Sequence, residues 1–295
     1  MVGTAVSFGL HLWGADPSGA ARWAEELGFD AVAVDRDVLA GPPGPEVWTA
    51  LTWVAARTAR VRVVPNVLVL ANRHPALVAK MGETLDRLSG GRLILALGAG
   101  AASNDGVAGA LGLHLGGLAP AERVAATEEA IDVLRGLWSG QAFTYAGTWF
   151  RIGGAEVRPA PVRPIPLWLG AYGPRMLDLA GRKADGWVPS LWALDPDSAY
   201  RGLERVRAAA SRAGRNPGAL TYAYNLGILV EERANPGPGQ VAGPPELVAK
   251  RLAAFARHGF THLSLWPGGD TDEQLARQIE LLADQVIPAV HALVG

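Results

Sequence analysis

A short glycine-containing segment has the residue types of an anion-binding turn. Gly170-Ala-Tyr-Gly-Pro-Arg175 follows an apolar run and leads into a run of helical periodicity, with Pro174 in the first turn. Free backbone N–H groups and the positive end of the helix dipole would then face one spot, where a phosphate could bind. An ordinary strand-to-helix turn would use the same residues, so both interpretations stand on this pattern alone.

Large aromatic side chains follow three of the apolar runs. Trp13 and Trp192 each stand shortly after a predicted strand, and Trp266 ends one. Loops seldom need such large apolar groups for packing alone, so we expect these three to form walls of a substrate pocket. Aromatic residues and glycines gathered at one rim suit a flat ring system whose tail is held by backbone amides.

Three ionisable residues are candidates for binding or chemistry. His11 ends the first strand, where it would either donate to a substrate or cofactor or make a structural hydrogen bond. Arg36 cannot serve as a base, because an arginine side chain has a pKa above about 12. It would bind an anionic group or pair with Asp35 or Asp37, and His114, in a glycine-rich stretch, would contact the substrate. We take His11 and Arg36 as the candidate catalytic residues.

The other histidines do not predict a metal site. His258 and His262 flank Gly259 and Phe260, so they would not share a helix face, and no carboxylates are arranged near them. His74 stands directly before Pro75 at an expected helix start, where it would fix the turn. We expect no metal dependence.

Short β-rich runs alternate with helical periodicity along the whole chain. The expected strands are Ala5–Leu10, Ala31–Asp35, Val61–Val69, Leu93–Gly98, Leu167–Gly170, Gly186–Pro189, Leu220–Val230 and His262–Trp266. The expected helices are Pro17–Leu27, Glu46–Thr58, Pro75–Leu88, Ala121–Trp138, Pro174–Lys183, Ser198–Ala213, Glu246–His258 and Asp272–Val286. Between the fourth and fifth strands, a small hairpin at Thr144–Phe150 and a proline-rich run at Arg158–Pro166 interrupt the rhythm.

Eight strands, each followed by a helix, predict an α/β fold with a single (β/α)8 barrel and an insertion between strands four and five. An open doubly wound sheet is the alternative. Its one support is Gly98-Ala-Gly-Ala-Ala-Ser103 after a strand, which is close to a dinucleotide fingerprint but ends in Ser. Turn residues follow it instead of a helix. In a barrel the active site lies at the C-terminal ends of the strands, which is where the candidates above stand.

Composition and charge exclude several classes of protein. The 295 residues include 27 Lys and Arg against 28 Asp and Glu, so no net field favours nucleic acid or an anionic membrane. No apolar run reaches the length of a membrane span. The absence of cysteine excludes disulfides and thiolate chemistry. With no leader pattern at Met1–Leu10, we expect a cytoplasmic protein whose partner is a small molecule.

Three stretches of the chain resemble the luciferase-like monooxygenase superfamily. They are the run from Val61 to Lys80 with its Asn-Arg-His-Pro-Ala segment, Leu88-Ser-Gly-Gly-Arg to Gly100, and Leu169–Arg175 with Ala184-Asp-Gly-Trp187. The resemblance extends over nearly the whole chain and implies one barrel domain over residues 1–295. It also implies a cofactor, either FMN or the deazaflavin coenzyme F-420, lying across the barrel mouth.

Details of the resemblance favour coenzyme F-420 over FMN. Leu137-Trp-Ser-Gly140, Gly147-Thr-Trp-Phe150 and Trp168-Leu-Gly170 are similar to the F-420-dependent branch. That branch implies a non-prolyl cis peptide behind the deazaflavin ring, here at Asn66–Val67. It also supports phosphate binding at the turn Gly170–Arg175. The resulting expected cofactor site comprises Asp35, Asn66, Val67, Gly98, Gly100, Ala171, Tyr172, Gly173, Pro174 and Gly186.

The chain also departs from the pattern of one group of relatives. Members that oxidise a sugar phosphate carry an Asp-His pair after strand two and a Glu after strand four, but here these positions are Asp35-Arg36 and Ala101. Three hypotheses follow: an F-420-dependent oxidoreductase transferring a hydride to or from a small organic substrate, an FMN-dependent monooxygenase supplied by a flavin reductase, or a non-catalytic flavin-binding relative. The resemblance further implies a homodimer.

Overall fold

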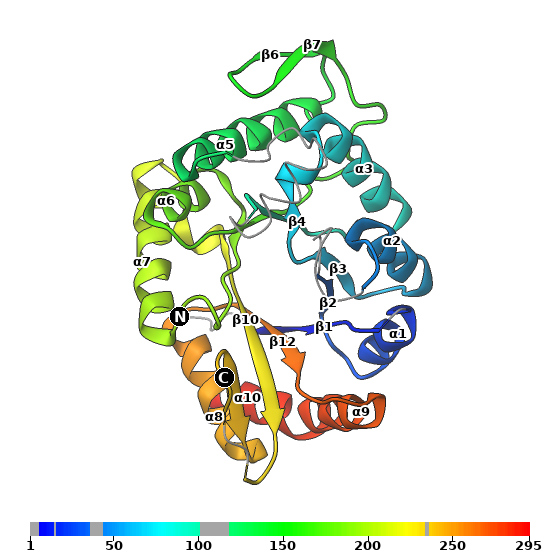
Figure 1. Ribbon diagram of the computed structural model, residues 1–295, viewed down its shortest axis with the longest axis vertical. Coiled ribbons are helices and arrows are strands. Elements are labelled where there is room, and N and C mark those ends of the chain that lie inside the picture. The colour runs from blue at the N-terminus through cyan, green and yellow to red at the C-terminus, as the bar shows by residue number, and fades with distance from the viewer. Residues whose placement is uncertain (1–5, 15, 36–43, 101–117, 234–235) are drawn as a thin grey trace.

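Parallel strands form the centre of the molecule and helices surround them (Figure 1). The computed structural model describes residues 6–14, 16–35, 44–100, 118–233 and 236–295. The strands of the main sheet are β1 (Ser7–His11), β2 (Ala31–Val34), β3 (Arg62–Pro65), β4 (Leu68–Val69), β5 (Leu95–Gly98), β8 (Leu167–Gly170), β9 (Gly186–Trp187), β10 (Thr221–Val230), β11 (Gln240–Gly243) and β12 (His262–Pro267).

The sheet closes on itself as a barrel. Its order is β3-β2-β1-β12-β10-β9-β8-β5-β4, and all of these pairs are parallel. The barrel closes where β3 bonds the residues just before β5: the Val63 amide donates to the Arg92 carbonyl (3.0 Å) and the Ile94 amide donates to the Val63 carbonyl (3.1 Å). The expectation of a (β/α)8 barrel is therefore confirmed, and the open-sheet alternative is wrong.

Helices cover the outside of the barrel. They are α1 (Ser18–Glu26), α2 (Val47–Arg57), α3 (Pro75–Leu88), α5 (Pro120–Leu137), α6 (Pro174–Lys183), α7 (Pro196–Arg212), α8 (Pro245–His258), α9 (Asp272–Leu281) and α10 (Ile287–Val294). Short 3-10 turns lie at Leu70–Asn72 and Pro217–Ala219, and a π-helical turn at Leu282–Val286 joins α9 to α10. In the described part of the chain, no helix is long and apolar enough to span a bilayer.

Alternation along each strand separates two cores. On β1, Phe8 and Leu10 face the helices and belong to the large outer core, whereas Gly9 and His11 face the lumen. A smaller group of buried residues fills the lumen itself: Ala31, Ala33, Val64, Ile94, Ala96, Trp168, Val188 and Ala223. Inward residues near the C-terminal ends of the strands therefore converge at one mouth.

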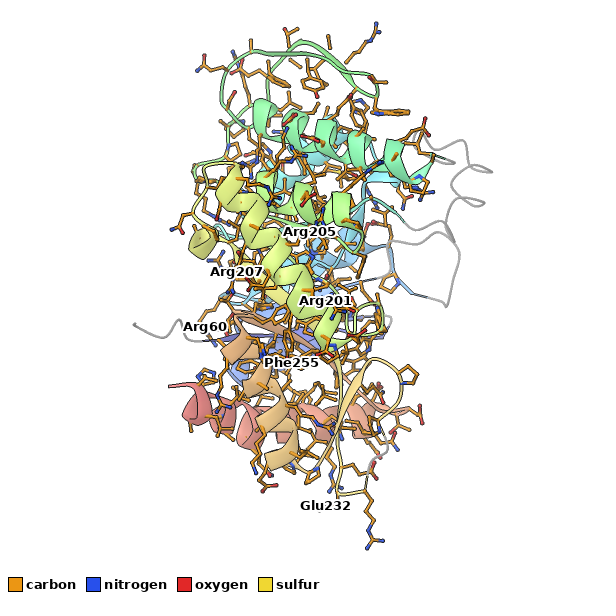
Figure 2. All side chains as sticks on the ribbon, turned by 90° about the vertical axis from the view of Figure 1, so that its left-hand side faces the viewer. Arg60, Arg201, Arg205, Arg207, Glu232 and Phe255 are labelled. Atoms are coloured by element: carbon orange, nitrogen blue, oxygen red, sulfur yellow. The ribbon has the colours of Figure 1, made fainter. Side chains whose placement is uncertain are left out.

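Close backbone approach joins α6 to α7. A Cβ on Gly181 would lie 2.3 Å from the Val206 carbonyl oxygen, so only glycine fits at this crossing. Figure 2 shows Arg201, Arg205 and Arg207 along α7, and Arg205 pairs with Asp178 of α6 (2.7 Å). These contacts hold α6, whose start carries the expected phosphate turn.

Arg92 of the Ser-Gly-Gly-Arg segment stabilises the scaffold by bonding backbone carbonyls. Its side chain is buried and donates to the carbonyl oxygens of Ala55 (2.7 Å), Thr58 (3.0 Å), Val61 (3.0 Å) and Ser89 (2.7 Å). The guanidinium thus satisfies the end of α2, the approach to β3 and the end of α3 together. This segment of the family resemblance reports on the scaffold, and not on the ligand site.

Three expected elements need correction. The hairpin is longer than Thr144–Phe150: its strands are β6 (Phe143–Ala146) and β7 (Arg151–Ala155). Residues 148–150 make the turn because their amides donate to the Glu129 carboxylate on α5. Strand β11, which pairs with β10, was not expected. The last helix does not end at Val286, since α10 follows it with Pro288 in its first turn.

The third barrel strand is interrupted at the cis peptide bond Asn66–Val67. Strand β3 ends at Pro65 and β4 begins at Leu68, so the expected strand Val61–Val69 is present as two pieces. The cis bond that the family resemblance implied is confirmed. Its two residues lie at the C-terminal mouth of the barrel.

Candidate functional site

His11 is the centre of a polar cluster at the mouth. It ends β1, and its side chain points into the lumen, where it is 3% exposed. The Nδ2 of Asn66 lies 3.4 Å from the His11 Nε2. Within the described residues, the His11 Nδ1 is buried and has no hydrogen-bond partner. The ring therefore has one occupied nitrogen and one unused nitrogen.

Two facing asparagines connect opposite sides of the mouth. The Asn66 Nδ2 donates to the Asn225 Oδ1 (2.7 Å), and the Asn225 Nδ2 donates back to the Asn66 Oδ1 (3.3 Å). The Asn225 Nδ2 also donates to the Ser190 Oγ (3.2 Å), to which the Tyr172 hydroxyl donates (3.4 Å). A chain of hydrogen bonds thus runs from the loop after β8 to His11 on β1.

An aromatic wall lies against the histidine. The indole of Trp266 stacks on the His11 ring with 5.0 Å between the ring centroids and 11° between the planes. Trp192 packs edge-on against Trp266 at 5.3 Å and is 59% exposed. Trp13 is half-buried, and its Nε1 donates to Asp272 at the start of α9 (3.3 Å). The structure therefore brings Trp192 and Trp266 together with His11, whereas Trp13 contacts the start of α9.

Burial keeps His11 uncharged. Desolvation by burial lowers the pKa of His11 from 6.5 to about 4. His262, deeper in the lumen, has a pKa lowered to about 4 by burial and by the nearby His11. Its Nδ1 lies 2.8 Å from the Ser7 hydroxyl. At neutral pH both rings are neutral, so His11 can exchange hydrogen bonds but carries no charge.

A compact apolar surface lies across the lumen on β4, β5 and β8. A Cβ on Gly98 would lie 2.5 Å from the Val67 Cγ2, and one on Gly170 would lie 3.4 Å from its Cγ1. Gly98 and Gly170 face each other in the register of β5 and β8. These two glycines make room for the Val67 side chain, which continues the lumen core up to the mouth.

A cavity of about 460 Å³ lies at the start of α6. Its lining includes Gly100, Arg123, Gly173, Pro174 and Arg175. Gly173 is the N-cap residue, no side chain caps this end, and a Cβ there would meet nothing within 4 Å. The expected phosphate turn is therefore an open helix start beside two arginines, with Ala171 buried behind it.

Gly186 has another explanation in the structure. A Cβ at this position would lie 2.4 Å from the Trp168 indole, so the glycine leaves room for this side chain in the lumen.

The remaining predicted residues lie at various places around the barrel. Asp35 follows β2 and is half-buried. Arg36 and His114, together with Ala101, lie outside the described residues. His74 caps α3 by accepting from the Ala76 amide (3.2 Å), as expected. The described residues contain no cluster of three potential metal ligands.

Asn225 and Ser190 stand where the barrel rule places candidates, Asn225 on the seventh strand and Ser190 after the sixth, but the sequence assigned neither of them a role. Asn225 interrupts the apolar run of β10, and a single amide in a buried strand is the signal that would have given it one. Ser190 follows β9 in a loop, with no pattern that separates it from other serines. Only the barrel closure brings these two next to Asn66.

The closed parallel sheet and its surrounding helices define a TIM-barrel protein with a buried polar cluster at its mouth. The family model for luciferase-like monooxygenases matches residues 18–235, and the chain belongs to this family.

Two relatives by sequence and one solved structure are similar to this chain. An F420-dependent glucose-6-phosphate dehydrogenase of Nakamurella multipartita is 29% identical, over 92% of this chain and 91% of that protein. A phthiodiolone/phenolphthiodiolone dimycocerosates ketoreductase of Mycobacterium bovis is 33% identical, over 74% of this chain and 57% of the relative. The structure of an F420-dependent secondary alcohol dehydrogenase in complex with an F420-acetone adduct superposes with a TM-score of 0.84 at 22% identity, covering 97% and 99% of the two chains.

Proposed function

We propose that the chain is a coenzyme F-420-dependent oxidoreductase that transfers a hydride between the deazaflavin and a small, uncharged organic substrate. The observation that carries this proposal is the pairing of two features at one mouth: the apolar surface of Val67 between Gly98 and Gly170, and the buried His11 with its unused Nδ1. The names of the relatives support the same cofactor and a dehydrogenase or reductase reaction.

The residues present fit this cofactor. Val67 offers an apolar surface against which a flat tricyclic ring can lie, and the cavity at Gly173 lies at the start of α6. Arg123 and Arg175 line that cavity and would attract the anionic tail. When bound, the coenzyme supplies a ring carbon that gives or takes a hydride. The protein positions the substrate beside it and provides a neutral hydrogen-bond donor.

The substrate pocket favours an uncharged ketone or alcohol over a sugar phosphate. Among the described residues, the cluster of side chains joined by hydrogen bonds and ring stacking at the mouth carries no charge at neutral pH; it comprises His11, Asn66, Tyr172, Ser190, Trp192, Asn225 and Trp266. The family's base and acid positions are occupied here by Arg36 and Ala101. Neither can exchange a proton with a sugar hydroxyl near neutrality.

A ligand titration followed by turnover tests the proposal. Purified protein is titrated with oxidised coenzyme F-420 and with FMN, following ligand fluorescence. Oxidation of reduced F-420 is then measured with short-chain ketones and, in parallel, oxidised F-420 with glucose 6-phosphate. We expect F-420 to bind at least tenfold more tightly than FMN, and ketones alone to be turned over. Tight FMN binding without F-420 binding would favour the monooxygenase, and cofactor binding without any turnover would favour the non-catalytic relative.

Other expectations remain predictions. We propose that residues 1–295 act as one domain, that the chain forms a homodimer and that it works in the cytoplasm. Light scattering coupled to size-exclusion chromatography measures the oligomeric state directly. A flavin reductase partner is expected only for the FMN alternative, since that reaction consumes reduced flavin.

A further inference from the structure

The contact between Asn66 and His11 determines which ring nitrogen carries the proton. The Asn66 Nδ2 lies 3.4 Å from the His11 Nε2, and an amide nitrogen can donate a hydrogen bond but cannot accept one. The His11 Nε2 is therefore the acceptor in this contact. In a neutral imidazole only one nitrogen carries hydrogen, so the proton of His11 is on Nδ1.

The Asn66 amide is held in place from the opposite side of the barrel, with its Nδ2 toward His11. Its Nδ2 and Oδ1 both bond to the Asn225 amide, at 2.7 and 3.3 Å. Asn225 is itself held by its backbone, since its N–H donates to the Pro189 carbonyl and its carbonyl accepts from Leu191, both at 2.9 Å. Its side chain donates to Ser190 as well. Strand β10 and the loop after β9 thus maintain the amide that faces His11.

The Nδ1–H of His11 is left available for a ligand. This nitrogen is buried and has no partner within the described residues. Buried polar groups in folded proteins are nearly always hydrogen-bonded, so an unused buried donor at a barrel mouth indicates a ligand acceptor. Trp266 stacks on one face of the same ring.

We propose that Asn66 is a positioning residue that holds His11 as the Nδ1–H tautomer, so that His11 donates a hydrogen bond to the substrate oxygen and does not act as a base. This inference rests on the proposed hydride-transfer function for its substrate. As hydride reaches a carbonyl carbon, the C=O π electrons move to oxygen, and the His11 N–H stabilises that negative charge. The ring keeps its proton, and water supplies the proton that completes the alcohol. Enzymes use neutral imidazole in this way to polarise carbonyl groups.

Nitrogen NMR of the histidine rings tests the tautomer on the protein alone. With ¹⁵N-labelled histidine, the His11 signals are assigned by their loss in His11→Gln, and the ring pattern separates Nδ1–H from Nε2–H. We expect Nδ1–H in the wild type. Asn66→Asp replaces the donor by a negatively charged acceptor of the same shape, which also raises the pKa of His11; read above that pKa, its His11 should carry hydrogen on Nε2. Tyr172→Phe, which changes only the far end of the hydrogen-bond chain, is the matched control and should leave the Nδ1–H form.

The Nε2–H form in the wild type would overturn the inference, whether or not F-420 binds and whether or not the variants fold. Kinetics then test the catalytic consequence. We expect Asn66→Asp to lower kcat for ketone reduction about 10- to 100-fold while the dissociation constant of F-420 changes less than threefold. An unchanged kcat in a variant whose tautomer has switched would also overturn it. Failure of wild-type F-420 binding, with the tautomer as expected, would instead contradict the proposed function.

Discussion

Mild acid should destabilise this barrel through its two buried histidines. In the unfolded chain a histidine takes up a proton near pH 6.5, whereas His11 and His262 in the fold do so only near pH 4. Their contribution to stability is therefore fully present above pH 6.5, declines as the pH falls toward 4 and is constant below that. Each shift of 2.5 units corresponds to about 3 kcal/mol over the whole window.

The comparison of pH 7 with pH 5 isolates this effect. Over that interval each histidine should remove about 2 kcal/mol from the free energy of unfolding, hence about 4 kcal/mol for the pair. Carboxylates with lowered pKa values, such as Glu46 and Glu128, contribute mainly below their ordinary value of 4.5. The lowered pKa of His262 already includes the effect of the nearby His11, so the sum is the full expected loss for the pair.

Urea unfolding at both pH values, followed by tryptophan fluorescence, measures the loss. The quantity compared is the difference between pH 7 and pH 5 within one variant, so the fixed cost of a substitution cancels. His11→Gln and His262→Gln should each remove about half of the wild-type difference. A wild-type difference below about 1 kcal/mol, or variants with the full wild-type difference, would refute the buried-neutral assignment.

Three further predictions test the scaffold and the cofactor site. Gly98→Ala places a Cβ 2.5 Å from the Val67 Cγ2, so it should cost about 1 to 3 kcal/mol in urea unfolding and weaken F-420 binding; equal affinity would show that the Val67 surface does not contact the ring. Gly173→Asp should weaken F-420 binding at least tenfold relative to Gly173→Asn, while stabilising α6 by about 0.5 kcal/mol through the helix dipole, so that titration and thermal unfolding change in opposite directions. Arg92→Met should lower the free energy of unfolding by about 3 kcal/mol or more, because it leaves buried carbonyls without donors; a neutral result would mean that water replaces the guanidinium.

The fold was predictable because its signals are local. Short apolar strands followed by amphipathic helices recur along the chain, and a parallel strand pair needs such a crossover. The interruption at Asn66–Val67 could be expected only from the family resemblance. Strand β11 could not be expected from Gln240–Gly243 by itself, because its pairing depends on how far β10 extends beyond the barrel. The turn at residues 148–150 likewise depends on Glu129, which lies on a distant helix.

The sequence by itself determined the barrel, the open helix start at Gly173 and the aromatic residues after the strands, since each is encoded by residues adjacent in the chain. Only the tertiary structure decided how His11 behaves. Its burial, its neutral charge and the nitrogen that carries its proton depend on Asn66 and Asn225. Asn66 is 55 residues from His11 along the chain, and Asn225 is a further 159 residues from Asn66. Barrel closure also places Gly186 against the Trp168 indole and the Arg92 guanidinium against the ends of α2 and α3 and the approach to β3. Packing in three dimensions, and not spacing along the chain, determines which groups a buried side chain meets.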